Sequence, residues 1–134
     1  LYEPADKPGH YYQNNFWQKR CAILNADDEG SYGALCTVLD EETAAHGYQV
    51  PLRTYAIRTQ ADVIATEIVY AVGQTTFVVH WWGGEFAVTS PLIGEFNVYN
   101  ILCAITVCLA LGVEPTVITD AVTAFTGVIV PTHQ

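Results

Sequence analysis

Gly94-Glu95-Phe96-Asn97-Val98-Tyr99-Asn100 is the stretch that decides the fold, because it opens the long apolar run from Ile101 to Val113. No charged residue follows Asn100 until Glu114. A continuous uncharged run of this length predicts a buried helix, which we expect to begin at Phe96 and to stop near Gly112. A second helix is predicted over Thr116–Thr126, with Pro115 in its first turn.

Asn97 and Asn100 lie three residues apart at the start of this helix, so their side chains share one face of its first turn. An amide offers a donor and an acceptor side by side, which matches the amine and ring nitrogen on the edge of adenine. Asparagine is also common at helix starts, where it caps the backbone. Both alternatives stay open from the spacing alone. Phe96 is expected to pack in the core and hold the helix, and packing beside a bound base is the alternative.

Upstream of this helix, three segments are rich in β-branched and aromatic residues: Asp62–Val72, Thr75–Trp82 and Glu85–Leu92. The dipeptides Gly73-Gln74 and Gly83-Gly84 separate these segments and are typical of hairpin turns. The sequence therefore predicts a three-stranded antiparallel meander over residues 62–92.

The N-terminal part predicts a strand, a helix and a second strand. The first strand begins at Cys21 and ends in the turn Asn25-Ala26-Asp27-Asp28, and the helix spans roughly Tyr32 to His46 with Gly47 as its C-cap. The second strand covers Leu52–Ile57. The order β-α-β, then a β-meander, then two helices predicts an α/β fold in which helices cover a sheet.

The composition bounds the class of protein. The chain has 134 residues, a formal net charge of −9 and 51 % apolar residues, which suits one soluble domain or part of one. Five scattered cations and no basic patch argue against nucleic-acid binding. No Lys or Arg follows Arg58, so the chain lacks the cations to hold a polyphosphate by itself.

Cysteines and histidines give no sign of a metal site. The four cysteines lack a C-x-x-C spacing, and the four histidines are far apart with no carboxylate at ligand spacing. We expect free thiols, no metal ion and a cytoplasmic protein. We also expect no membrane insertion, because no apolar run is long enough to span a bilayer.

Several motifs in the same order make the chain resemble the Mur ligases, the ATP-dependent enzymes that build the peptidoglycan stem peptide. Asn25-Ala26-Asp27-Asp28 resembles the N-x-D-D turn of the family, and Ala61-Asp62-Val63 resembles the segment that opens its meander. Residues 92–100 resemble its L-x-G-x-F-N-V-x-N motif. The resemblance covers about residues 20–130 and is greatest to the member that adds the third residue to UDP-N-acetylmuramoyl-dipeptide.

The same resemblance indicates what is missing. The family's P-loop has no counterpart here, since no G-x-x-G-K-[ST] pattern occurs, and its carbamylated lysine has no clear match. The closing G-V-x-G-R pattern is replaced by Gly127-Val128-Ile129-Val130-Pro131-Thr132. Residues 1–134 are therefore expected to be a partial central, ATP-binding domain, without its P-loop half and without the C-terminal domain.

What the resemblance implies about chemistry is an ADP-forming amide ligase in the parent protein. ATP would phosphorylate a carboxylate of a UDP-N-acetylmuramoyl-peptide, and the amine of an amino acid would attack it, with Mg²⁺ present. The resemblance assigns Asn97 and Asn100 to adenine binding and leaves Asn25, Asp27 and Asp28 as a possible nucleotide or substrate loop. A helix cap would equally explain one of the two aspartates.

No catalytic residue and no tightly bound cofactor are expected in this chain, which should be inactive alone. Two alternatives remain from the sequence. One is a non-catalytic acidic α/β binding module with a degenerate nucleotide pocket, and the other is a related ligase of the folylpolyglutamate or cyanophycin synthetase type.

Overall fold

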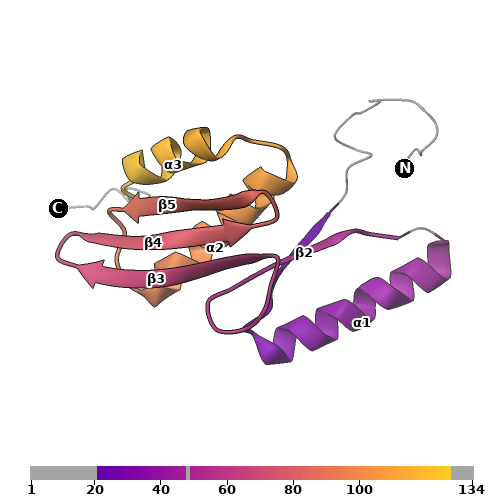
Figure 1. Cartoon of the computed structure of the whole chain (residues 1–134). Helices are drawn as coiled ribbons and strands as arrows, with labels where there is room; N and C mark the ends of the chain where they lie inside the picture. Colours follow the sequence, from indigo (N-terminus) through magenta and orange to yellow (C-terminus); the bar gives the residue numbers. More distant parts are fainter. Residues whose placement is uncertain (1–20, 48, 128–134) are drawn as a thin grey trace, which may run out of the picture. The chain divides into compact units, whose positions relative to one another are not determined.

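The computed structural model describes residues 21–47 and 49–127 of the chain (Figure 1). Its elements are β1 (Ala22–Asn25), α1 (Glu29–His46), β2 (Leu52–Ala56), β3 (Val63–Ala71), β4 (Gln74–Trp81), β5 (Gly84–Ser90), α2 (Glu95–Ala110) and α3 (Pro115–Ala124). The strands form one five-stranded sheet in the order β1-β2-β3-β4-β5. The predicted mixed α/β fold and its order of elements are confirmed.

The chain divides into two compact units, and the smaller one contains most of α1. It comprises Leu1–Ala22 and Gly33–Leu52, of which the structure describes 21–22, 33–47 and 49–52. No residue of α1 is buried. The apolar residues Leu35 and Val38 of this helix are 44 % and 50 % exposed.

The larger unit, Ile23–Tyr32 and Arg53–Gln134, is described as far as Gly127 and contains the antiparallel meander of β3, β4 and β5. The first turn contains Gly73 in the left-handed region, with φ +78°. At the second turn, the Trp81 ring lies over Gly83 so closely that a Cβ on Gly83 would be 2.4 Å from the ring. A turn forms near each predicted place but one residue earlier, at Val72-Gly73 and Trp82-Gly83, and Gln74 and Gly84 are already the first residues of β4 and β5.

The connection between β2 and β3 is short for two parallel strands. Tyr55 pairs with Val63 in parallel register, although such strands usually need a crossover of a dozen residues or more. Asp62 fastens the end of this connection, because its carboxylate accepts hydrogen bonds from the backbone N–H (2.9 Å) and the hydroxyl (3.2 Å) of Thr54. The Asp62 N–H in turn donates to the Thr54 hydroxyl oxygen at 3.0 Å. This reciprocal pair gives the A-D-V segment a structural role.

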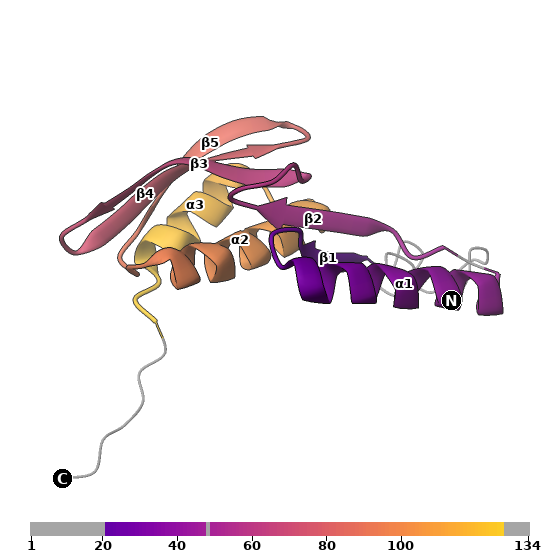
Figure 2. The same ribbon diagram turned by 90° about the horizontal axis from the view of Figure 1, so that it is seen from below.

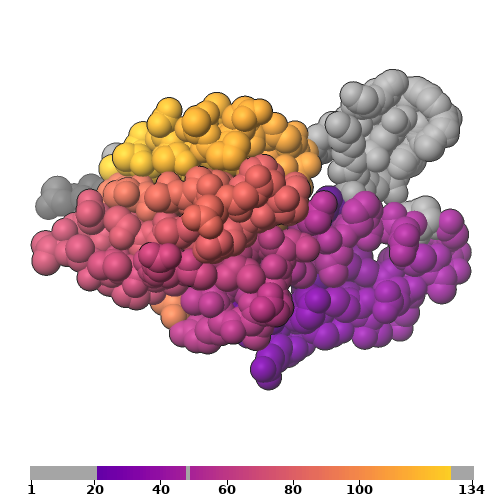
Figure 3. Space-filling model, in the orientation of Figure 1, coloured from indigo at the N-terminus to yellow at the C-terminus, as the bar shows by residue number. Residues whose placement is uncertain are grey.

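Helices α2 and α3 lie on one face of the meander (Figure 2), and the hydrophobic core fills the space between them. Val98, Leu102 and Ile105 of α2 are fully buried against Val63, Phe77, Val79 and other strand residues. Figure 3 shows α3 directly beside β5, and the Thr123 hydroxyl donates to the Thr89 carbonyl at 3.1 Å. The core thus fixes α2, the helix that carries both candidate adenine-binding amides.

Phe96 corrects one expectation. Its side chain is 77 % exposed, although the sequence analysis placed it in the core. The positions that do face the core are those related to Val98 by helical spacing, such as Ile101, Leu102 and Ile105. Phe96 lies two residues before Val98, about 200° away around the helix axis, so it faces solvent.

Candidate functional site

The loop after β1 is shaped by its own side chains. The Asn25 side-chain oxygen accepts a hydrogen bond from the Asp27 N–H at 2.9 Å, which closes a local turn. The Asp28 carboxylate accepts from the Ser31 N–H at 3.3 Å, which is the geometry of an N-cap for α1. The helix-cap alternative therefore describes Asp28, while Asp27 is free of that role.

Asp27 joins three segments that are distant in the sequence. Its carboxylate accepts hydrogen bonds from the backbone N–H groups of Ile57 (2.7 Å), Arg58 (3.0 Å) and Thr59 (3.0 Å). The hydroxyls of Thr59 (2.8 Å) and Tyr99 (2.7 Å) donate to the same carboxylate. Three successive backbone N–H groups that point to one place form an anion-binding site. Here the carboxylate of Asp27 occupies that site.

These hydrogen bonds set the charge of Asp27. Partial burial by itself would raise the pKa of the carboxyl group, but the donors from Ile57, Tyr99, Arg58 and Thr59 outweigh it and lower the pKa to about 2. They do so because each one stabilises the ionised form. Asp27 is therefore a carboxylate throughout the neutral range, held at the end of β1 where an α/β sheet gathers its binding loops.

Arg58 and two residues of α2 extend this network. The Arg58 guanidinium donates to the Tyr99 hydroxyl oxygen at 2.8 Å and forms an ion pair with Glu95. Burial and the neighbouring Asp27 carboxylate raise the pKa of Tyr99 to about 12, so its hydroxyl keeps its proton and can donate to Asp27. The start of α2 is thereby tied to the loops that follow β1 and β2.

The sequence analysis missed Arg58, Glu95 and Tyr99. One signal could have found them, because Glu95 and Tyr99 occupy the two open positions of the L-x-G-x-F-N-V-x-N pattern that lie within α2. These positions are four residues apart and share a helix face. Arg58, the last cation of the chain, is the natural partner for an acidic residue on that face.

The two candidate adenine-binding amides have different surroundings. The Asn97 side chain is half-buried, and its amide nitrogen donates to the Ile93 carbonyl at 2.9 Å. Asn100 is exposed, and no hydrogen bond engages its amide among those found in the described part of the chain. Gly94, the N-cap of α2, supplies no side-chain cap. Asn97 therefore has a backbone contact at the start of the helix, and Asn100 keeps its amide available.

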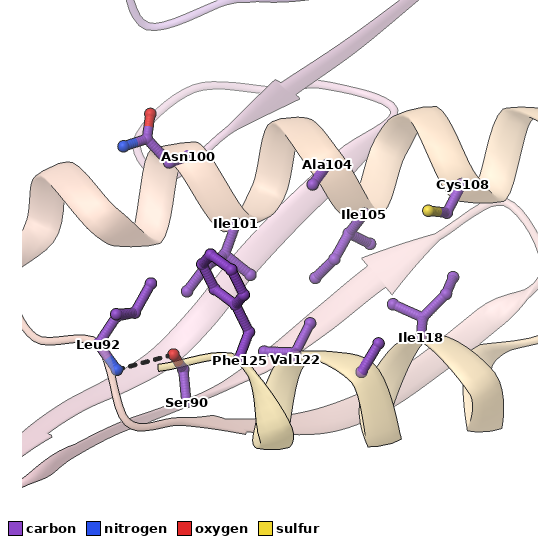
Figure 4. A pocket seen from close by; sticks show the side chains of 11 residues that line it. Ser90, Leu92, Asn100, Ile101, Ala104, Ile105, Cys108, Ile118, Val122 and Phe125 are labelled. Atoms are coloured by element: carbon purple, nitrogen blue, oxygen red, sulfur yellow. Dashed lines mark hydrogen bonds between the residues drawn. The ribbon is translucent and has the colours of Figure 1, made fainter. Parts of the chain in front are cut away.

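An apolar cavity of about 350 Å³ lies between α2 and α3 (Figure 4). Its wall includes Leu92, Ile101, Ile105, Ile118 and Phe125, and Asn100 lies at its edge. In Figure 4 the amide of Asn100 turns away from Leu92 and Phe125. Among the described residues that line this cavity, Asn97 is absent, so the cavity does not unite the two amides.

Neither a metal cluster nor a membrane span occurs in the part of the chain that the structure describes. Within residues 21–47 and 49–127, no three His, Cys, Asp or Glu side chains are placed to hold a metal ion. None of the helices in these ranges combines the length and apolarity needed to cross a bilayer. Cys36, Cys103 and Cys108 are free thiols and, like Cys21, they are half-buried.

Comparison with known proteins gives a consistent result. The family described as Mur ligase middle domain matches residues 13–108. The UDP-N-acetylmuramoyl-L-alanyl-D-glutamate–2,6-diaminopimelate ligase of Bacillus licheniformis is 38 % identical over 107 residues, which is 80 % of this chain and 20 % of that protein. The ligase of the same name from Bacillus cereus is 34 % identical over 120 residues, 90 % of this chain and 22 % of that protein.

Solved structures agree with these sequence matches. A structure of a UDP-N-acetylmuramoyl-L-alanyl-D-glutamate–2,6-diaminopimelate ligase superposes with a TM-score of 0.68 at 27 % identity, over 82 % of this chain and 22 % of that one. MurF from Acinetobacter baumannii superposes with a TM-score of 0.62 at 28 % identity, over 81 % and 21 % of the two chains. The chain thus spans about a fifth of the length of the curated relatives it matches.

Proposed function

The chain belongs to the Mur ligase middle domain family, and from this premise we propose that it supplies the adenine-binding part of an ATP-dependent amide ligase of peptidoglycan synthesis. The parent protein would add the third amino acid to a UDP-N-acetylmuramoyl-dipeptide in the cytoplasm. Three relatives from Bacillus species are named as UDP-N-acetylmuramoyl-L-alanyl-D-glutamate–2,6-diaminopimelate ligases. Membership of this family favours the ligase over an unrelated acidic binding module.

One observation of the structure carries the proposal. Asn100 presents an exposed amide on α2, and Asn97 lies one turn earlier on the same helix, which the buried core and the Asp27 network hold in place. An amide placed in this way can pair with the amine and ring nitrogen of adenine. Asn97, which donates to Ile93, would orient the helix start and contribute its remaining oxygen.

The described residues do not fit the phosphate and metal part of such a site. Arg53 and Arg58 are the cations of residues 21–127, and Arg58 is already paired with Glu95. No three side chains of residues 21–47 and 49–127 could hold a metal ion. We therefore assign neither Mg²⁺ nor the phosphates of ATP to residues of this chain, and place Asn25, Asp27 and Asp28 in the loop that borders the nucleotide.

Titration of this chain with adenosine, followed by ¹H–¹⁵N NMR, tests the proposal directly. Wild-type protein should bind adenosine weakly, with shifts in the side-chain amide signals of Asn100 and Asn97. Asn100→Ala should raise the Kd about 5–150-fold, because one amide pair with a base edge is worth about 1–3 kcal/mol. Gln74→Ala, which removes an exposed amide at the β3–β4 turn, is the matched control and should leave the Kd unchanged.

The parent ligase offers a second test. Asn97→Ala should raise the apparent KM for ATP far more than that for the amino acid, whereas equal effects on both substrates would contradict adenine binding. The isolated chain should show no ATP turnover. Steady turnover by pure wild-type chain that Asn97→Ala abolishes would overturn our assignment of the phosphate chemistry to other parts of the parent.

A further inference from the structure

The start of α2 lacks the usual means of fixing a helix N-terminus. Its N-cap is Gly94, with φ +99°, and no side chain caps the free N–H groups there. A good capping side chain contributes about 0.5–2 kcal/mol to helix stability. Without one, the first turn is held by the buried Val98, by the hydrogen bond from Asn97 to Ile93 and by lateral contacts. Asn97 and Asn100 belong to this turn and the next.

The lateral contacts come from the two open positions of the motif. Glu95 and Tyr99 lie four residues apart and meet Arg58 on the loop after β2. The Tyr99 hydroxyl also donates to Asp27 at 2.7 Å, so one hydroxyl links a guanidinium and a carboxylate from two different loops. Both hydrogen bonds have normal lengths, and Tyr99 is half-buried.

We propose that Tyr99 is a positioning residue of the nucleotide site, whose hydroxyl holds the start of α2 against the loops after β1 and β2. In this way it sets the direction in which the neighbouring amide of Asn100 points. The inference rests on the proposed function, because positioning has a meaning only if Asn100 contacts the base. It concerns the hydroxyl at position 99, one of the open positions of the motif.

The geometry favours Tyr99 over Arg58 as the residue that positions the start of α2. The Arg58 side chain is exposed, and its ion pair with Glu95 has side chains 59 % and 45 % exposed, so water and salt screen it. The bond between Tyr99 and Asp27 joins a half-buried hydroxyl to a carboxylate that three backbone N–H groups already hold in place. Because its acceptor is held in place, the hydrogen bond from Tyr99 to Asp27 restrains α2 more strongly than the ion pair between Arg58 and Glu95 does.

The test compares single-hydroxyl variants of this chain. Tyr99→Phe removes the two hydrogen bonds and keeps the ring, while Thr123→Val removes the hydroxyl that ties α3 to β5 and serves as the control. Adenosine Kd, melting temperature and the side-chain amide signals of Asn100 are measured for each. Tyr99→Phe should raise the Kd at least fivefold and shift or broaden the Asn100 signals, whereas Thr123→Val should change neither.

The remaining outcomes separate the two proposals. A purely structural role for Tyr99 predicts a lower melting temperature with an unchanged Kd in the folded protein, and that result would overturn the inference. Arg58→Gln should change the Kd less than twofold, and an effect equal to that of Tyr99→Phe would also overturn it. If Asn100→Ala leaves adenosine binding unchanged, the proposed function fails, and this inference fails with it. If Asn100→Ala weakens binding and Tyr99→Phe does not, only the inference fails.

Discussion

Helices α1 and α2 have similar lengths, 18 and 16 residues, but opposite relations to the hydrophobic core. Six residues of α2 are buried, and α1 has none. The sequence predicted α2 from a continuous uncharged run, and α1 from a segment between a possible cap at its start and Gly47 at its end. The difference teaches that such signals predict where a helix forms, while burial depends on a sheet face that receives it.

The two helices also differ in their number of acidic residues. Glu95 is the one acidic residue of α2, in its first turn, where it also pairs with Arg58. By contrast, α1 contains Glu29 and the acidic run Asp40, Glu41 and Glu42. An uncharged helix cannot remain solvated on all sides, so α2 needs the meander, whereas the charged residues of α1 are compatible with contact with water.

Truncation of a leucine in each helix should give the largest contrast. Leu102→Ala in α2 removes a fully buried side chain and should lower the free energy of unfolding by about 2–5 kcal/mol, through lost burial and the cavity left behind. Leu35→Ala in α1, where the side chain is 44 % exposed, should change it by less than about 1 kcal/mol. Urea unfolding measures both, and equal losses would break the comparison.

The two neighbouring aspartates provide a second contrast, between a long-range network and a local cap. Asp27→Asn should cost about 1.5–3 kcal/mol, the range for hydrogen bonds to a charged group. Asp28→Asn should cost only a few tenths, because asparagine caps a helix about as well as aspartate.

The contribution of Asp27 to stability also depends on pH and decreases in acid. The pKa of Asp27 is lowered from 3.8 to about 2 on folding, so its stabilisation is present above pH about 4 and is lost as the pH falls towards 2. Thermal unfolding between pH 2 and 7 should show wild-type and Asp27→Asn proteins converging at the acid end. A stability gap that stays constant down to pH 2 would contradict the network.

Alanine at two glycines gives a contrast in which the two effects on stability have opposite signs. Gly83→Ala places a Cβ 2.4 Å from the Trp81 ring, and the resulting shift should cost about 1–3 kcal/mol. Gly33→Ala, inside α1 with no neighbour within 4 Å, should stabilise the chain by about 0.5–1 kcal/mol through helix propensity. Melting temperatures should therefore move in opposite directions, and a shared direction would show that α1 is more tightly packed than the structure indicates.

Local signals were sufficient for most of the fold. The meander was predicted from β-branched residues and two glycine turns, and its strands lie within a few residues of the expected bounds. Pro115 begins α3 as expected, and Gly47 follows α1 with φ +73°, as a C-cap glycine should. These features depend on backbone preferences and on side-chain periodicity, which act over a few residues.

The candidate site was predictable only in part. Asn97 and Asn100 stood out because two amides at the start of an uncharged helix are visible in the sequence itself, and their role in adenine binding stays a prediction. Phe96 was placed wrongly, since one aromatic residue at a helix start can face the core or the solvent. The partners of Asp27 could not be foreseen from a turn motif that lies 72 residues before Tyr99.

The sequence by itself determined the elements, their order and the family of this protein, because periodicity, turn residues and motif spacing are properties of neighbouring residues. Only the tertiary structure decided that α1 has no buried residue, how Asp27 and Asp62 hold the tight parallel connection, and that Tyr99 and Arg58 meet beside the candidate amides. These outcomes depend on donors and acceptors that the chain brings together from distant positions. A carboxylate in a turn has no preferred partner until the fold closes around it.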